Sequence, residues 1–255
     1  AVGFPLQRSP ARARCQEQMI IGLRMLTQPP PRRSICQNAM GDPPTLAAEA
    51  VLWRQGLRLV AGVDEVGRGP LAGPVAAGAV ILPPGVRLSG RYSWLAQVRD
   101  SKRLTPRTRE ELAALIHQTA LGAAVAFVPH TAIDRLGIAE ATRQAMLAAI
   151  TQLPTRPDHL LIDALRLPAC SLNQTAIIAG DSTSLSIACA SIIAKVARDR
   201  LMVECHTIYP SYGFAAHKGY ATPDHLHALR RLGPCPLHRR SFSPIREMLA
   251  AALPV

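Results

Sequence analysis

The chain has 255 residues, 48% of them hydrophobic, and carries a formal net charge of +12 with a pI of about 10.3. This apolar content excludes an intrinsically disordered chain, and no apolar run reaches the roughly 18 residues that would predict a membrane span. So basic a domain usually binds a polyanion, which makes nucleic acid the first candidate partner, although an excess of arginine is also typical of GC-rich genomes.

The cysteines indicate a reducing compartment, because they are scattered through a chain long enough to bury a core. None forms a C-x-x-C pair, which argues against a structural zinc site. We therefore expect a cytoplasmic protein. The six are Cys15, Cys36, Cys170, Cys189, Cys205 and Cys235.

Residues 1–44 are predicted to be a disordered or non-native extension rich in arginine and proline. Residues 1–39 contain six arginines and a single acid, Glu17, and Pro29–Pro31 excludes a helix there. Three interpretations stay open: a start site assigned upstream of Met40, which we prefer; a basic tail that binds nucleic acid; and a targeting segment.

Residues 45–255 are predicted to form one α/β domain. Thr45 and Thr105 are candidate helix caps, and residues 83–104 resemble a loop. Three strands in succession, followed by strands that alternate with helices, indicate a mixed sheet with a helical carboxyl-terminal part. The patterns predict strands over 57–65, 73–82, 120–128, 159–163 and 175–179, and helices from 45, over 106–119, 131–136, 139–151, 184–204, 222–232 and 243–252.

Acidic residues stand at or just beyond the ends of three apolar strands. Asp64 and Glu65 end the first strand, Asp163 ends the run Leu160–Asp163, and Asp181 follows the run Ile177–Gly180. Strand ends far apart in sequence can meet at one edge of a sheet, where clustered carboxylates repel one another unless they bind cations. Oxygen ligands of this kind favour Mg²⁺ or Mn²⁺, so the sequence predicts a site for divalent cations.

A purely structural role competes with this interpretation, since each acid could instead cap a turn or a helix. The alternative is strongest for Asp181, ahead of the helix predicted from Ser184. Glu65 raises a further difficulty, because neighbours on a strand point to opposite faces. It can share a metal with Asp64 only if the strand bends there.

With the stretch Val63-Asp64-Glu65-Val66-Gly67-Arg68-Gly69-Pro70 the chain resembles the type 2 ribonucleases H, and from about residue 45 to 250 it closely resembles bacterial ribonuclease HII. Further stretches agree in family order: Ala61–Val75, Asp100–Leu104, Leu161–Asp163, Gly180–Asp181, Ala190–Asp199, Tyr212–Phe214, His217–Tyr220 and His238–Phe242. One departure is visible at Ala179, where many relatives carry lysine.

This resemblance implies an RNase H-like fold with a five-stranded mixed sheet flanked by helices. It also implies hydrolysis of RNA in RNA–DNA hybrids and incision 5′ to single ribonucleotides in duplex DNA, giving 5′-phosphate and 3′-hydroxyl ends. The family's four acids map onto Asp64, Glu65, Asp163 and Asp181, the first of which we expect to bridge two metals. Its Gly-Arg-Gly loop maps onto Gly67, Arg68 and Gly69, and its sugar-stacking tyrosine onto Tyr220.

Other polar residues receive weaker assignments. Lys102 and Lys218 are candidate phosphate contacts, with a solvated loop charge as the alternative for Lys218. Lys195 and Asp199, four residues apart, predict an intrahelical ion pair. We expect His217 and His238 to be structural or to contact phosphate rather than bind metal.

The rival function is a non-catalytic basic protein that binds nucleic acid on the same fold. Four clustered acids argue against it, because negative charge beside a phosphate weakens simple binding. We expect a monomer, and residues 249–255 contain no convincing motif for a protein partner such as a sliding clamp.

Overall fold

The computed structural model describes residues 43–251, so the interpretations that concern residues 1–42 and 252–255 lie outside it. The predicted five-stranded mixed sheet is present, and its strand order is β3-β2-β1-β4-β5. β1 pairs antiparallel with β2 and parallel with β4. β2 pairs antiparallel with β3, and β4 pairs parallel with β5. The strands are β1 Val60–Val66, β2 Val75–Ile81, β3 Gly122–Val128, β4 His159–Asp163 and β5 Gln174–Ile177.

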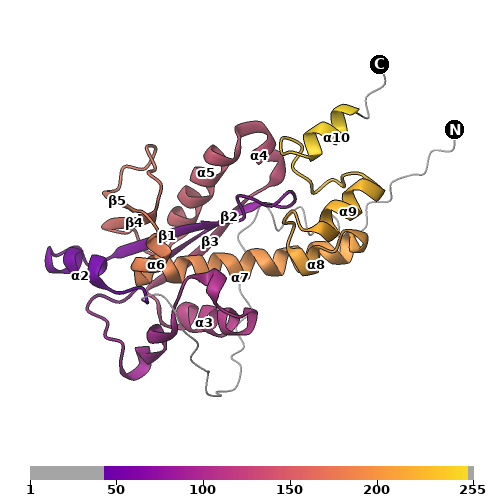
Figure 1. The fold of residues 1–255 in the computed structure, drawn as a ribbon. Helices are drawn as coiled ribbons and strands as arrows, with labels where there is room; N and C mark the ends of the chain where they lie inside the picture. Colours follow the sequence, from indigo (N-terminus) through magenta and orange to yellow (C-terminus); the bar gives the residue numbers. More distant parts are fainter. Residues whose placement is uncertain (1–42, 252–255) are drawn as a thin grey trace.

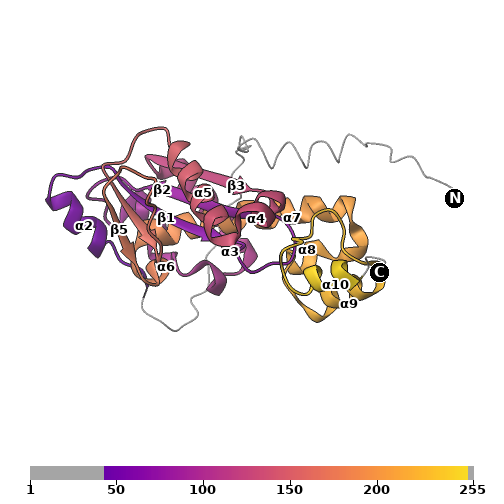
Figure 2. The same ribbon diagram turned by 90° about the horizontal axis from the view of Figure 1, so that it is seen from above.

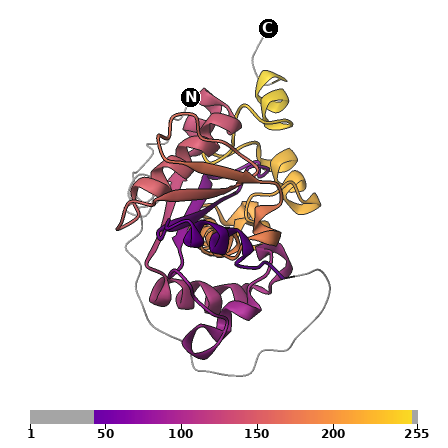
Figure 3. The ribbon, with the colours of Figure 1, turned by 90° about the vertical axis from the view of Figure 1, so that its left-hand side faces the viewer.

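Helices cover both faces of this sheet (Figure 3). On one face α4 (His130–Leu136) and α5 (Ile138–Thr151) bury an alanine-rich cluster against β1, β2 and β3. On the other lie α7 (Leu185–Ile208) and α3 (Pro106–Thr119), with a second apolar cluster between them and the sheet. The short α2 (Ala47–Arg54) packs near the start of α7 (Figure 1).

α7 approaches the sheet closely because two glycines face it. A Cβ added to Gly62 in β1 would lie 2.1 Å from the backbone of Ser186, and one added to Gly78 in β2 would lie 2.3 Å from the carbonyl oxygen of Ala190. Such contacts are sterically impossible, so both positions require glycine for this packing. The central helix therefore lies directly against the strand that carries Asp64.

The carboxyl-terminal helices gather beyond the end of the sheet, around the last turns of α7 (Figure 2). They are α8 (Phe214–His217), α9 (Pro223–Leu232) and α10 (Ile245–Ala251), and they enclose an apolar cluster of their own with the end of α7. Within the described range, no helix has the length and apolarity needed to cross a membrane.

Two local expectations were wrong. Residues 83–104 contain two 3₁₀ helices, Gly90–Gln97 and Ser101–Arg103, which bury Trp94 and Leu95. The N-cap position of α2 is Leu46 and not Thr45, although the Thr45 hydroxyl accepts a hydrogen bond from the N–H of Ala47 at 3.3 Å. Thr45 also forms a parallel bridge with Ser184, which ties the start of the domain to the start of α7. Thr105 does cap α3, as predicted, by accepting a hydrogen bond from the N–H of Thr108.

Candidate active site

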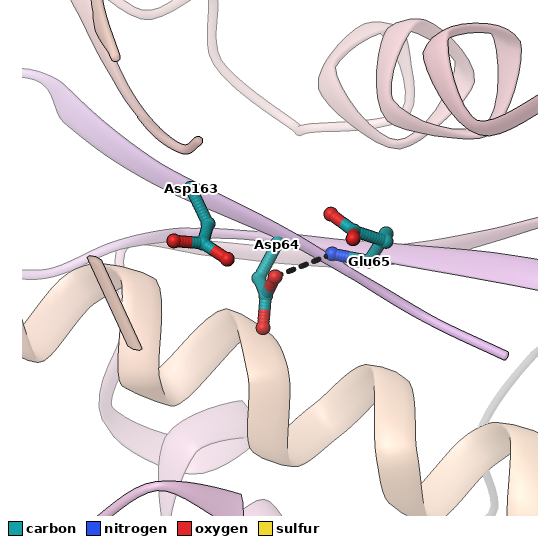
Figure 4. A group of neighbouring side chains, drawn as sticks. All are labelled: Asp64, Glu65 and Asp163. Atoms are coloured by element: carbon teal, nitrogen blue, oxygen red, sulfur yellow. Dashed lines mark hydrogen bonds between the residues drawn. The ribbon is translucent and has the colours of Figure 1, made fainter. Parts of the chain in front are cut away.

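Three acidic side chains converge at the carboxyl end of the parallel strands. Asp64, Glu65 and Asp163 each offer a carboxylate oxygen, and these oxygens lie within 4.8 Å of one another (Figure 4). Strand pairing explains the meeting, because Val63 is in register with Ile162, so Asp64 and Asp163 follow side by side on β1 and β4. This is the spacing that a shared divalent cation requires.

Glu65 joins the group without a break in β1, contrary to the expected bend. β1 stays paired with β2 as far as Val66, whereas its pairing with β4 ends at Val63. The β4 side of β1 is therefore open at Asp64 and Glu65. Asp64 points toward α7, and the Glu65 carboxylate reaches the same open edge from the other face (Figure 4).

The electrostatics of this group fit a cation. Burial raises the pKa of Asp64 well above its usual range and the carboxylates of Glu65 and Asp163 raise it further, while hydrogen bonds from Ser191 and from the Glu65 N–H lower it in part. Burial is also the largest cause that raises the pKa of Glu65 and of Asp163. The Oε2 atom of Glu65 is buried and has no hydrogen-bond partner within residues 43–251. An all-oxygen set with one unused buried ligand atom fits Mg²⁺ or Mn²⁺.

Asp181 lies in the same cavity but outside the group of three. The cavity, of about 470 Å³, is lined by all four acids. Asp181 belongs to the short α6 (Gly180–Thr183), and its Oδ2 lies 3.8 Å from the ammonium of Lys102. It does not cap α7, because Ser184 does so by accepting from the N–H of Ile187. A role for Asp181 as the cap of α7 is therefore excluded.

The backbone of α6 also holds Asp163 in place. The N–H of Gly180 donates to Asp163 Oδ1 at 2.7 Å. Ala179, at the position where relatives often have lysine, adopts a left-handed conformation with φ of 52°. That conformation is unfavourable for a residue with a Cβ, so the turn that leads into α6 and Asp181 is locally strained.

Two serines that the sequence did not single out for a role support Asp64. Ser191 on α7 donates a hydrogen bond to the Asp64 carboxylate. Its Oγ lies 3.0 Å from the Oγ of Ser101, and the carbonyl of Ser101 accepts from the guanidinium of Arg109 at 2.9 Å. The only sign of these serines in the sequence is that they lie in stretches that resemble the family, Asp100–Leu104 and Ala190–Asp199.

Lys102 faces the acids, as a phosphate contact near the metal would. Its side chain is 78% exposed, although its backbone N–H is fixed by the carboxylate of Asp100 at 2.9 Å. Partial burial opposes protonation of the ammonium, but the carboxylates of Asp100, Asp181, Asp64 and Asp163 raise its pKa. Lys102 is therefore an exposed positive charge at the edge of the cavity.

The Gly67–Gly69 loop is built on two buried arginines. A Cβ on Gly67 would lie 2.1 Å from Nε of Arg198, and the φ of Gly67 is 87°, so this glycine is required by packing as well as by conformation. Arg239 donates to the carbonyls of Gly67 at 2.6 Å and Arg68 at 2.7 Å. Arg68 itself is exposed and lies 3.4 Å from Glu65.

Tyr220 lies at the boundary between the acidic cavity and an adjoining groove of about 680 Å³. Its side chain is 39% exposed, and the cationic groups of Lys195 and Arg198 lie 5.7 and 5.9 Å from its ring centre. Lys218 lines only the groove, and its ammonium bonds to the carbonyl of Ala215. The structure thus separates Lys218 from the acids and brings Tyr220 to their edge.

The remaining polar predictions agree with the geometry. Lys195 and Asp199 form the expected intrahelical ion pair, at 2.7 Å. Lys195 also lines both cavities, so its position is not fully explained by that pair. His217 and His238 contact no acid of the cluster and instead lie in the carboxyl-terminal part.

Comparison with known proteins agrees with this geometry. The sequence profile of the family described as Ribonuclease HII matches residues 61–245. The Ribonuclease HII of Dehalococcoides mccartyi is 53% identical over 205 residues, which cover 80% of this chain and 95% of that protein. The chain belongs to the ribonuclease HII family. It is therefore a ribonuclease H, a metal-dependent hydrolase that acts on the RNA of RNA–DNA hybrids.

Other ribonucleases HII and solved structures give the same result. The Ribonuclease HII of Geobacillus kaustophilus is 52% identical over 204 residues, covering 80% of this chain and 75% of that protein. The ribonuclease H2 of Pyrococcus horikoshii has a TM-score of 0.64 at 26% identity, covering 75% of this chain and 97% of that one. The RNase HII of Archaeoglobus fulgidus, solved as a complex with PCNA, has a TM-score of 0.61 at 25% identity, covering 72% and 95%. The RNase H-like fold expected from the sequence is confirmed.

Proposed function

We propose that this ribonuclease HII cleaves RNA–DNA hybrids and also incises duplex DNA 5′ to a single embedded ribonucleotide, by a reaction that uses two divalent ions. The observation that carries the proposal is the meeting of Asp64, Glu65 and Asp163 within 4.8 Å, in a cavity that Tyr220 also lines. Carboxylates for metals and an aromatic ring for a sugar thus border the same space.

We assign all four acids as metal ligands, with different roles. Asp64 is central and buried, and we assign it as the ligand common to both ions, with Glu65, Asp163 and Asp181 completing the two coordination shells. A pair of Mg²⁺ or Mn²⁺ ions would activate the attacking water and stabilise the leaving 3′ oxygen, giving a 5′-phosphate and a 3′-hydroxyl. Lys102 would neutralise charge on the bound phosphate.

Selectivity requires contact with the one atom that distinguishes ribose from deoxyribose, the 2′-hydroxyl. We assign this contact to the backbone of Gly67, Arg68 and Gly69, of which Gly69 is exposed and has open space around its Cα. Tyr220 would stack on the deoxyribose that follows and disfavour a hydroxyl there. Lys218, in the groove, would contact a phosphate further along the duplex.

A nicking experiment tests the proposal directly. The protein is incubated with Mg²⁺ or Mn²⁺ and a duplex that contains one ribonucleotide, next to an all-DNA duplex of the same sequence. We expect a nick 5′ to the ribonucleotide and none in the control. A nick in the control would indicate a general nuclease. Tight binding without any nick would favour the rival non-catalytic function.

Several predictions from the sequence stay predictions. These are the monomeric state, the cytoplasmic location and the division into an extension at 1–44 and a catalytic domain at 45–255. Gel filtration, fractionation of the native cell and mass spectrometry of the native amino terminus would test them in turn.

A further inference from the structure

Three histidines form a cluster beneath the loop that carries Tyr220. His217 and His225 stack with ring centres 4.3 Å apart, and the Nε2 atoms of His225 and His238 are 3.0 Å apart. Phe214 lies against all three rings and is fully buried. His225 and His238 are buried as well, at 0% and 1% exposure. The cluster touches none of the four acids, so metal binding does not explain it.

With His225 and His238 both neutral, the hydrogen bonds of this cluster give one arrangement of protons. Nδ1 of His225 lies 2.8 Å from the carbonyl oxygen of Tyr220, so it must carry the proton and donate. Nδ1 of His238 lies 2.9 Å from the backbone nitrogen of Cys235 and 3.2 Å from the carbonyl oxygen of Cys235, so it could accept from the one or donate to the other. Nε2 of neutral His225 has no proton to donate, so the proton of neutral His238 must be on Nε2, and its Nδ1 accepts from the Cys235 N–H. His238 Nε2 then donates to His225 Nε2, which is free to accept. A continuous chain of hydrogen bonds therefore runs from Cys235 to Tyr220.

His217 fixes the same loop at a second point. Its Nδ1 accepts from the N–H of Gly219 at 3.2 Å, so its Nε2 carries the proton and donates to the carbonyl of Tyr212 at 2.7 Å. His217 is therefore neutral, as His225 and His238 are in the arrangement above. Burial agrees, since it lowers the pKa of His225 and of His238 to about 4.

The loop needs such support because its backbone is strained. Lys218 and Gly219 are both left-handed, with φ of 52° and 86°, and a side chain at 218 makes this conformation costly. A loop of this kind keeps one shape only where its surroundings fix it. Besides the histidines, Arg198 donates to the carbonyl of Lys218 at 3.1 Å and Thr222 donates its N–H to the carbonyl of Tyr220 at 2.8 Å.

We propose that His225, oriented by His238, is a positioning residue that holds the backbone of Tyr220 so that its ring meets the sugar at the RNA–DNA junction. The inference rests on the proposed junction function of Tyr220. His225 itself touches no substrate and acts through the Tyr220 carbonyl. This role requires both histidines to be neutral, with the proton of His225 on Nδ1 and the proton of His238 on Nε2.

Nuclear magnetic resonance of ¹⁵N-histidine-labelled protein tests the arrangement without any activity measurement. Near pH 7 we expect His225 to show the neutral form protonated at Nδ1, which is the minor form of free histidine, and His238 the form protonated at Nε2. Signals are assigned by their loss in H225N and H238Q. A charged His225, or one protonated at Nε2 alone, would overturn the proposal.

Matched variants test whether the hydrogen bond from His225 to the Tyr220 carbonyl has a function. Asn and Leu have nearly the same shape, but only the amide of H225N can donate to the Tyr220 carbonyl. We expect H225L to lower the rate of nicking at a single ribonucleotide roughly tenfold more than the rate on an all-RNA hybrid strand, and H225N to recover most of that difference. The control H227L changes an exposed histidine on the same helix and should alter neither rate.

The outcomes separate positioning from simple packing. Equal losses on both substrates in H225L and H225N, with a lower melting temperature, would show a packing role and refute the proposal. If H225L does not fold, the protonation pattern and the rates of H225N decide. If the wild type fails to nick the single ribonucleotide, the proposed function falls, whereas the protonation pattern still tests the hydrogen-bond chain by itself.

Discussion

The acidic cluster and the Tyr220 loop border one cavity but are held in place by different means. Asp64 and Asp163 are positioned by strand pairing, since the register of β1 and β4 alone brings them side by side. The Tyr220 loop has no sheet beneath it and depends on hydrogen bonds from side chains to its backbone, donated by Arg198 and His225. Cleavage and sugar selection should therefore respond differently to substitution.

This difference has an energetic side. The acids are costly where they are, because burial and mutual repulsion raise the pKa of all three clustered carboxyls. The loop is costly because of its left-handed residues. A bound cation offsets the free-energy cost of the clustered carboxylates, whereas hydrogen bonds and packing within the fold always offset the cost of the left-handed loop residues. The acidic site should thus be sensitive to metal, and the loop should not.

The largest expected effect is at the acidic cluster. D64N should reduce cleavage of both substrates by at least about a thousandfold, since it removes the ligand assigned to both ions. Hybrid binding should be kept or strengthened, because one negative charge near the phosphate is lost. The measurements are single-turnover rates and a binding titration, with D224N on the exposed first turn of α9 as the control. Substantial remaining activity would contradict the bridging role of Asp64.

Tyr220 should show the opposite pattern, a selective loss. Y220A should lower nicking at a single ribonucleotide roughly tenfold more than cleavage of an all-RNA strand, the scale expected for one lost stacking contact. Y220F keeps the ring and should keep the preference. The ratio of the two kcat/KM values is the measurement. If that ratio is unchanged in Y220A, Tyr220 does not sense the junction.

A smaller effect on both substrates is expected at Ser191, which supports Asp64 from α7. S191A removes the hydrogen bond to the carboxylate and should reduce metal-dependent activity roughly tenfold, as is usual when a metal ligand loses its support. The concentration of Mn²⁺ needed for half-maximal activity should rise. S171A, in an exposed loop, is the control. A selective loss at the junction would place Ser191 with the Tyr220 loop rather than with the acids.

The sequence predicted the acidic cluster better than the loop for a physical reason. The strand ends at Asp64 and Asp163 are visible as local patterns, and parallel pairing brings such ends together. The Tyr220 loop was found only through resemblance, and the side chains that support it and the Gly67–Gly69 loop were missed. Arg198 lies far along the chain from the carbonyls of Ala72 and Pro74 that it contacts, and no periodicity marks such a contact. The hydrogen bond between His225 and His238 likewise has no signature in the sequence. Asp181 is an intermediate case, placed in the right cavity but outside the closest group.

The smallest expected effect is the pH dependence of stability that His225 and His238 produce. Their pKa in the folded protein is about 4, below the usual value of 6.5, so between these pH values the unfolded chain binds more protons. Their contribution to stability is therefore present above pH about 6.5 and is lost as the pH falls toward about 4. The titratable groups around the pair are His217, His130 and Tyr212, and none of them provides a negative charge. The protonated, positively charged forms of His225 and His238 are therefore not stabilised by these neighbours.

Urea unfolding at several pH values measures this contribution as a difference between variants. Buried carboxyls with raised pKa, such as Asp64, act with the opposite sign in the same range, so the absolute slope mixes both effects. H225N should reduce the slope by up to about one proton relative to the wild type, and H227N, its exposed neighbour, should not. An unchanged slope in H225N would mean that the histidine cluster can accept protons without cost. In that case the conformation of the Tyr220 loop would not require His225 and His238 to be neutral, whereas the clustered acids would still require a cation.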